Sequence, residues 1–239
     1  MLAATEANRK ANGKRTVKII VKSMEGPWGT GSKMAVDLIF NDKVAAIIGA
    51  VDGRNGHLVE QACTKTQVVM LSVFAMDPTL SQAFVPWFYN CIPNDKQQAA
   101  ALAEEIFLKQ KLKNIVVIYD KAYDSGFSLK YFRMKTAEMG KGIRELAVIS
   151  DEKTENERIA SKAAADGTDG VVLFCSAERT AELAAAITSR KPSLRSYTSS
   201  HAADDDAAGT EIMGALMKKS YLTTSLFNMP EFELFRASY

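Results

Sequence analysis

Apolar runs alternate with helical patterns along almost the whole chain, and this alternation restricts the fold more than any other feature of the sequence. Val44–Ala50 is apolar on both faces, as a strand buried in a parallel sheet is, and Asn55–Thr66 follows it with helical spacing. The same pair of patterns recurs at Asn114–Asp120 and Ser125–Gly140. Because parallel neighbouring strands need a crossover, usually a helix, this repeated order predicts an α/β fold built from βαβ units.

The alternation extends in both directions and restarts once. Further strands are predicted at 16–23, 68–73, 86–92, 143–150, 169–176, 194–200 and within 211–224, and further helices at 31–42, 94–111, 156–167 and 178–190. The order restarts at Cys91–Asn94 after an irregular stretch, and there are too many units for one compact sheet. We therefore expect two Rossmann-like lobes, residues 1–92 and 93–227, each a parallel sheet flanked by helices.

Composition and charge exclude several classes of protein. The net charge is +2 with basic residues spread along the chain, whereas a nucleic-acid-binding protein needs a clustered basic face. No apolar run reaches the roughly 18 residues that span a bilayer. Cys63, Cys91 and Cys175 are odd in number and far apart, which argues against a disulfide framework or a zinc site, so we expect free thiols. The residues predict neither a metal nor a cofactor.

Three glycines after the first buried strand raise the alternative of a nucleotide-binding enzyme. Gly49, Gly53 and Gly56 have G-x-x-x-G-x-x-G spacing, close to that of short-chain dehydrogenases but not the same. Tyr131 and Lys135 supply a Tyr-x-x-x-Lys pair like the catalytic pair of that family. However, such a loop should close the first strand of the fold, and the next strand ends without the acid that binds a ribose. We therefore expect no enzymatic activity, with an NAD(P)-dependent reductase as the alternative.

Parallel α/β sheets bind ligands at the carboxyl ends of their strands, so the loops there form the candidate site. Asp52 and Arg54 stand at the start of a helix whose first N–H groups suit a carboxylate or another anion, and Arg54 can add a bidentate contact. The alternative is that these two side chains pair with each other at the surface. Phe74 and Met76 offer apolar contact with a ligand or packing between the lobes. Tyr123 can stack on a ligand or cap the sheet.

The order of segments resembles that of a known family. "NDKVAAIIGAVDGRNGHLVEQACTKTQVVMLSVFAMDPTLSQ" is similar to the first lobe of the type 1 periplasmic binding proteins, in particular the Leu/Ile/Val-binding, extracellular ligand-binding receptor family. "VPWFYNCIPNDKQQAAALAEEI" resembles that family's crossover into lobe two. "NIVVIYDKAYDSGFSLKYFRMKTAEMGKGI" resembles its lobe-two strand, D-x-x-Y-G loop and helix. The likeness covers nearly the whole chain and rests on the order and spacing of the segments.

This resemblance implies that a ligand binds between the two lobes. The residues it places in the ligand site are Asp52, Gly53, Arg54, Phe74, Ala75, Met76, Tyr123, Ser176 and Ser200. Amino-acid binders of the family carry Ser and Thr in the first two loops, where this chain has Asp-Gly-Arg and Phe-Ala-Met. A bulkier or aromatic ligand with a charged group is therefore expected in place of a branched-chain amino acid.

The function that the resemblance implies is solute binding for an ABC-type transporter. A small polar molecule of the amino acid, amide or aromatic acid class would be delivered to a membrane permease, and a ligand-sensing regulatory domain on the same fold is the alternative. The implied location is periplasmic or otherwise extracytoplasmic, and the N-terminus itself has no pattern of a secretory signal. The family pattern also implies that the first strand of lobe one is missing and that 228–239 return toward that lobe. The open sheet edge would then allow a homodimer.

Overall fold

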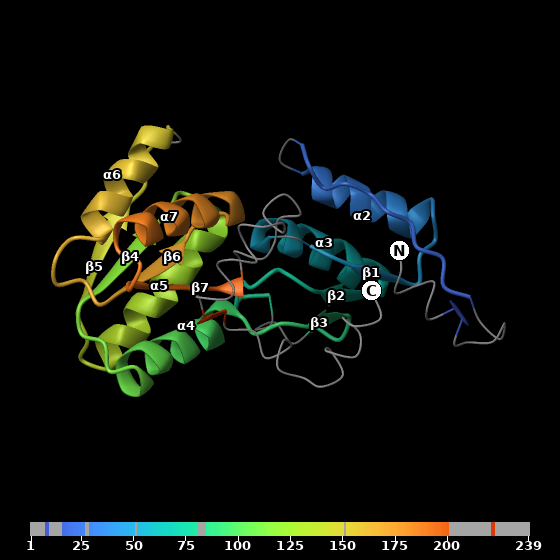
Figure 1. The fold of residues 1–239 in the computed structure, drawn as a ribbon. Coiled ribbons are helices and arrows are strands. Elements are labelled where there is room, and N and C mark those ends of the chain that lie inside the picture. Colours follow the sequence, from blue (N-terminus) through green and yellow to red (C-terminus); the bar gives the residue numbers. More distant parts are fainter. Residues whose placement is uncertain are drawn as a thin grey trace.

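Two parallel sheets organise the chain (Figure 1). The computed structural model describes residues 8–9, 16–26, 29–50, 52–80, 85–150, 152–200 and 221–222. The first sheet has three strands and the second has five, and every pairing within them is parallel. The predicted α/β class with parallel sheets and flanking helices is therefore confirmed. The lobe boundaries 1–92 and 93–227 stay a prediction, and 228–239 lie outside the described residues.

The first sheet has the strand order β1-β2-β3 and packs against two helices. Its elements are α2 (Thr30–Phe40), β1 (Ala46–Ile48), α3 (Gly53–Thr66), β2 (Val69–Ser72) and β3 (Phe88–Asn90). Ile47 and Met70 of the strands share a core with Ala35 and Ile39 of α2 and with Val59 of α3. The two helices bury these residues because their apolar positions recur every three or four residues and so share one face.

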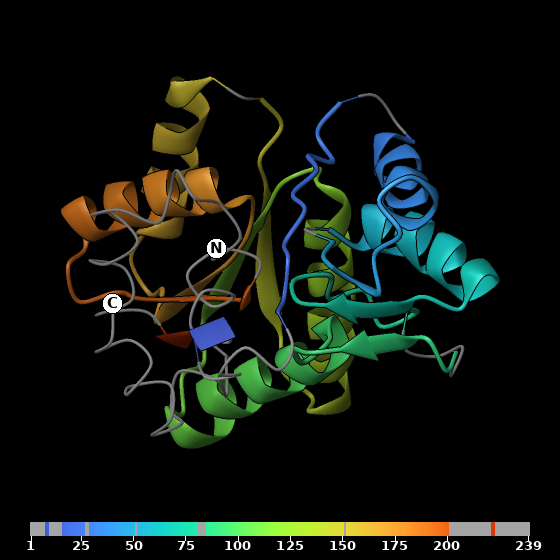
Figure 2. The ribbon, with the colours of Figure 1, turned by 90° about the vertical axis from the view of Figure 1, so that its right-hand side faces the viewer.

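The second sheet has the strand order β5-β4-β6-β7-β8 and carries helices on both faces, as Figure 2 shows for α7 above it and α4 below. Its strands are β4 (Ile115–Tyr119), β5 (Ile143–Ala147), β6 (Gly170–Phe174), β7 (Arg195–Thr198) and β8 (Tyr221–Leu222). Its helices are α4 (Asp95–Glu104), which continues as the π-helical turn η1 (Glu105–Lys109), and α5 (Tyr123–Glu138), α6 (Lys153–Ala163) and α7 (Ala177–Arg190).

Strand β4 explains why the sequence reads as a continuous apolar run there. Ile115 and Val117 lie in one core, beneath α4 and α5, whereas Val116 and Ile118 lie in the other, beneath α6 and α7. Successive side chains of a strand point to opposite faces, so a strand covered on both faces must be apolar at every position. The burial of this strand confirms that the second half of the chain has two packed helical layers.

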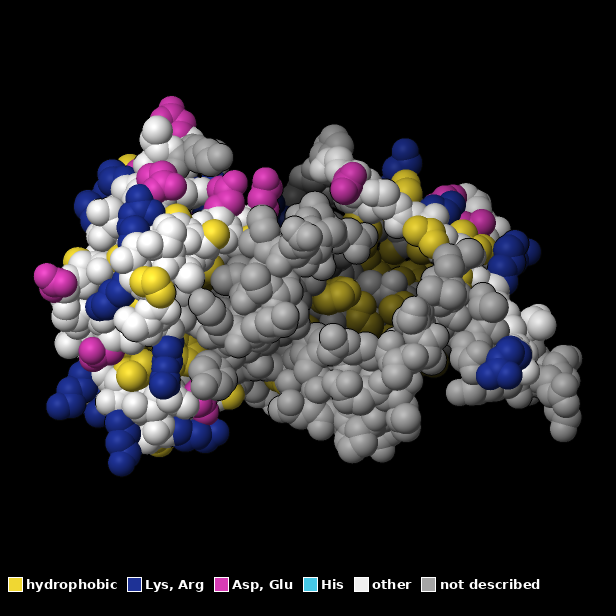
Figure 3. Space-filling view, viewed as in Figure 1, with side chains coloured by type: hydrophobic (Ala, Val, Ile, Leu, Met, Phe, Trp, Pro, Cys, Tyr) yellow, Lys and Arg dark blue, Asp and Glu magenta, His cyan; other side chains and the backbone are white. Residues whose placement is uncertain are grey.

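One predicted strand is wrong. Residues 16–23 are extended but join neither sheet, and Val17 and Val21 in them are exposed. A strand ladder needs a neighbour with free N–H and C=O groups, and here the segment is separated from β1 by a hollow of about 780 Å³. Apolar side chains gather in a hollow over β1 and β2 in Figure 3. Self-association through the edge of β1 stays a prediction.

Two further sequence expectations can be compared with the structure. Cys63, Cys91 and Cys175 are free as predicted; the first and third are buried and Cys91 is exposed. Among the helices of the described residues, none combines the length and the hydropathy needed to cross a membrane.

The start of α4 is stabilised by a reciprocal capping box, so Asn94→Ala should destabilise the protein. Asn94 Oδ1 accepts the Gln97 N–H at 3.1 Å, and Gln97 Oε1 accepts the Asn94 N–H at 2.9 Å. We expect the substitution to lower the free energy of unfolding by about 1 kcal/mol, measured by urea denaturation. Lys96→Ala, an exposed change in the same turn, is the control, and an equal loss in both variants would contradict the role of the cap.

Candidate ligand-binding site

Residues from the strand ends of both sheets meet where the two lobes touch. Direct contacts across this junction include Gly53 N–H to Asp124, Tyr123 Oη–H to Asp77, and Ser200 Oγ to Met76 Sδ. We call the residues 52–54, 74–77, 123–124 and Ser200 the interlobe site. Most of them were predicted as ligand residues from the sequence, but Asp77 and Asp124 were not.

Helix α3 begins two residues earlier than predicted, and the side chain of the preceding residue caps its N-terminus. Asp52 is the N-cap residue, and its Oδ1 accepts the Asn55 N–H at 2.6 Å. The Arg54 guanidinium lies 5.3 Å from the centre of the Tyr123 ring in lobe two. Asp52 and Arg54 thus have separate partners, which differs from the surface ion pair considered as the alternative. Arg54 contributes instead a cation–π contact between the lobes.

Gly53 lies where the two lobes approach most closely among the described glycines. A Cβ atom at this position would lie 2.8 Å from Asp77 Cβ, 2.9 Å from Asp124 Oδ1 and 3.0 Å from Tyr123 Cε1. These distances are too short for any side chain, so glycine is needed here for close approach. Gly56 has a similar role within lobe one, because its Cβ would lie 2.9 Å from Leu80. These two glycines therefore serve packing, which disfavours a phosphate-binding loop.

Asp77 is the polar centre of the interlobe site, and sequence reasoning missed it. Its fully buried carboxylate accepts hydrogen bonds from Tyr123 Oη at 2.9 Å and from the Thr79 N–H at 2.8 Å, and His57 Nε2 lies 3.0 Å away. Burial raises the pKa of Asp77, but the hydrogen bonds from Thr79, His57 and Tyr123 together hold it below its usual range. Burial and the hydrogen bond to Asp77 raise the pKa of Tyr123 to about 12.

Asp124 and Asp95 add two more buried carboxyl groups. Tyr123, which was predicted to lie in a loop, is the first residue of α5, and Asp124 is the second. The carboxylate of Asp124 accepts the Gly53 N–H. Burial raises the pKa of Asp124 to about 6. Asp95 Oδ1 accepts the Ser128 hydroxyl at 2.5 Å, whereas its buried Oδ2 has no hydrogen-bond partner among the described residues. Burial, reinforced by the charges of Asp124 and Asp77, raises the pKa of Asp95 to about 8.

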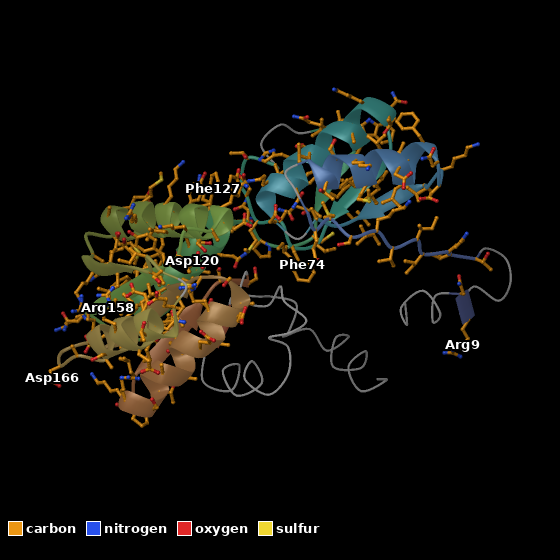
Figure 4. The ribbon with its side chains drawn as sticks, turned by 90° about the horizontal axis from the view of Figure 1, so that it is seen from above. Arg9, Phe74, Asp120, Phe127, Arg158 and Asp166 are labelled. Carbon is orange, nitrogen blue, oxygen red and sulfur yellow. The ribbon has the colours of Figure 1, made fainter. Side chains whose placement is uncertain are left out.

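The second predicted loop of lobe one lies at the junction. Phe74 is 40% exposed and lies on the lobe-one side of the junction in Figure 4, where Asp120 and Phe127 mark lobe two. Ala75 and Met76 are buried, and Met76 Sδ accepts hydrogen bonds from Gln98 Nε2 at 2.9 Å and from Ser200 Oγ at 2.8 Å. Phe74 is therefore the exposed member of this loop, and Met76 packs between the lobes.

The last two predicted ligand residues, Ser200 and Ser176, lie in different surroundings. Ser200 is held at the interlobe site, because its N–H donates to Gln98 Oε1 at 2.8 Å. Ser176 is exposed at the N-cap of α7, and its N–H donates to Asp120 Oδ2 at 2.9 Å. Ser176 therefore faces solvent beside the loop that precedes α5.

The Tyr-x-x-x-Lys pair has ordinary helical surroundings. The Tyr131 ring stacks on Phe127 of the same helix at 6.4 Å, and the Lys135 ammonium lies 4.0 Å from Glu138. Both residues thus make side-chain contacts with neighbours three or four positions away on α5, as helical residues commonly do.

Two parallel α/β lobes that touch through residues at their strand ends define the class of bilobal ligand-binding proteins. A model of the family described as "Receptor family ligand binding region" matches residues 1–197. The chain belongs to this family, as the sequence resemblance indicated. Members and structural neighbours are binding proteins and receptors rather than enzymes.

Solved structures confirm the fold. The chain is similar to LivJ of Streptococcus pneumoniae in complex with isoleucine, with a TM-score of 0.71 and 15% identity over 83% of this chain and 57% of that chain. It is similar to the leucine-binding protein LivK of Thermotoga maritima, with a TM-score of 0.70 and 17% identity over 87% of this chain and 61% of that chain. It is also similar to a solute-binding protein of R. palustris in complex with benzoate. The TM-score is 0.71, and the identity is 14% over 87% of this chain and 60% of that chain. The chain spans less than two thirds of each.

Two plant receptors have a higher sequence identity to this chain, over shorter stretches. Glutamate receptor 2.9 of Arabidopsis thaliana is 32% identical over 97 residues, which are 40% of this chain and 10% of that protein. Glutamate receptor 2.8 of the same organism is 34% identical over 88 residues, which are 37% of this chain and 9% of that protein.

Proposed function

We propose that this chain is a solute-binding protein that captures a small polar molecule between its two lobes. The observation that carries the proposal is the interlobe site, where strand-end residues of both lobes meet through Gly53, Asp77, Tyr123 and Asp124. A hinge motion that separates the lobes would expose these polar groups, and a bound molecule would hold the lobes together. The ligand contacts are proposed at the nine residues named from the sequence, with Asp77 and Asp124 added.

The proposal includes delivery of the ligand to the permease of an ABC-type transporter, outside the cytoplasm. It is supported by structural neighbours that are substrate-binding proteins of such transporters, among them complexes with isoleucine, leucine and benzoate. A sensory role is the second candidate, favoured by the identity to the plant glutamate receptors. Both functions need the same ligand-binding step, so binding is the property to test first.

A thermal-shift and calorimetric titration tests the proposal. The panel consists of amino acids, aromatic acids, and their amides and amines, with NADH and NADPH included for the reductase alternative. A true ligand at one hundred times its Kd adds about 2.7 kcal/mol to the free energy of unfolding and raises the Tm by roughly 5–10 °C in a chain of this size. We expect such a shift from at least one organic ligand and none from the nucleotides. No shift across the organic panel, or a shift with NADH alone, would overturn the proposal.

A further inference from the structure

The anion-binding end of α3 is already filled by carboxylates of the chain itself. The N–H groups at a helix start attract negative charge, and a ligand carboxylate is the natural occupant in a solute-binding protein. Here the Gly53 N–H donates to both oxygens of Asp124, at 3.1 and 3.4 Å, and the Asn55 N–H donates to Asp52. Asp124 reaches this position from lobe two, 71 residues away in the chain.

The packing around this contact leaves no place for a second carboxylate. Asp124 is 3% exposed, and Gly53 is buried against Asp77 and Tyr123 so closely that a single added carbon atom would overlap them. A ligand carboxylate could reach the Gly53 N–H only by displacing the side chain of Asp124. The contact is therefore an internal substitute for a bound anion.

The charges at the junction favour the opposite kind of ligand. Asp52 and Asp77 both act electrostatically on Asp124. The basic group facing Asp124 is the Arg54 guanidinium, which lies over the Tyr123 ring. A further negative charge brought into this group of carboxylates would be repelled, and a positive one would be attracted.

We propose that Asp124 sets the ligand specificity: its carboxylate occupies the anion-binding end of α3, so that the interlobe site accepts a ligand through a positively charged amine and rejects one held by its carboxylate. This inference rests on the proposed function. It names the ligand class as organic amines, with the apolar part of the ligand against Phe74, the exposed residue of the adjoining loop.

Matched pairs of probes test this specificity by calorimetric titration. Isopentylamine and 4-methylpentanoate share one apolar body, and benzylamine and benzoate share another; in each pair only the charged group differs. We expect the wild-type protein to bind the amines roughly tenfold or more tightly than the carboxylates, because like charges placed together at an interface are strongly unfavourable. Asp124→Asn should weaken or remove this preference, since its amide oxygen can still accept the Gly53 N–H while one negative charge of the group is gone.

Two further variants make the test decisive. Asp124→Ser removes the same charge with a smaller side chain and serves if the asparagine variant does not fold. Asp166→Asn makes the same chemical change at the far end of lobe two (Figure 4) and should keep the wild-type order. Equal binding of amines and carboxylates by the wild-type protein, unchanged in Asp124→Asn, would overturn the inference and leave the proposed function standing. Binding of no probe to any variant would count against both.

Discussion

Replacing Asp95 with asparagine should stabilise the protein, and the gain should be larger at pH 8 than at pH 5. Asp95 is 1% exposed, and its pKa is raised from 3.8 to about 8 by burial, with Asp124 and Asp77 adding to the effect. The folded protein therefore binds this proton more tightly than the unfolded chain does. Folding takes up the proton between those two pH values, so the free energy of unfolding falls as the pH rises through this window.

Asparagine removes this loss because it has no proton to titrate. Its Oδ1 can still accept the Ser128 hydroxyl, and its amide matches the protonated carboxyl that the wild-type protein holds at pH 5. Since one pKa unit corresponds to about 1.36 kcal/mol, we expect the gain at pH 8 to exceed the gain at pH 5 by at least about 2 kcal/mol. Urea denaturation at both pH values measures it. Asp166→Asn, on an exposed carboxylate, should change stability at neither pH. A variant less stable than the wild-type protein at pH 8 would show that Asp95 is needed as a charged group.

Gly53→Ala should force the lobes apart and weaken ligand binding by roughly 10- to 100-fold. The added methyl group would meet Asp77 of lobe one and Asp124 and Tyr123 of lobe two at 2.8–3.0 Å. Overpacking of this kind costs about 1–3 kcal/mol, and here most of the cost falls on the state in which the lobes touch. At about 1.4 kcal/mol for each factor of ten, that cost gives the expected loss of affinity.

Small-angle scattering and titration distinguish this effect from unfolding. We expect a larger radius of gyration for Gly53→Ala with the circular dichroism of the folded protein retained. Gly126→Ala is the matched control, because a Cβ there meets no atom within 4 Å and the position is exposed on α5. If both variants show the same scattering and the same affinity, the contact at Gly53 does not control how the lobes meet.

The elements of the fold were largely predictable because their signals are local. Ile115–Tyr119 reads as a buried strand because each of its residues must suit a core, and Asn94 reads as a helix start because its cap partner lies three residues away. The prediction failed at residues 16–23, where the local pattern is that of a strand but no neighbour pairs with it. Strand formation depends on a partner, and the apolar pattern contains no information about one.

Some residues of the interlobe site could also be predicted from the sequence, and others could not. The loops that carry Asp52–Arg54, Phe74–Met76 and Tyr123 could be selected because loops at the carboxyl ends of parallel strands follow directly from the order of the elements. That these residues bind a ligand stays a prediction. Asp77 and Asp124 were missed although each adjoins a predicted residue. An acidic residue in a loop reads as solvent-exposed until the fold buries it, and no local pattern distinguishes the two cases.

The order of residues was therefore sufficient for the class of fold, the family and the loops at the strand ends, because periodicity, caps and strand ends depend on neighbours in the chain. Only the tertiary structure showed that Asp124 occupies the start of α3 and that Tyr123 donates to Asp77, since these partners are 71 and 46 residues apart. Burial and charge at such a contact are set by groups from two lobes at once, so no single stretch of the sequence contains them.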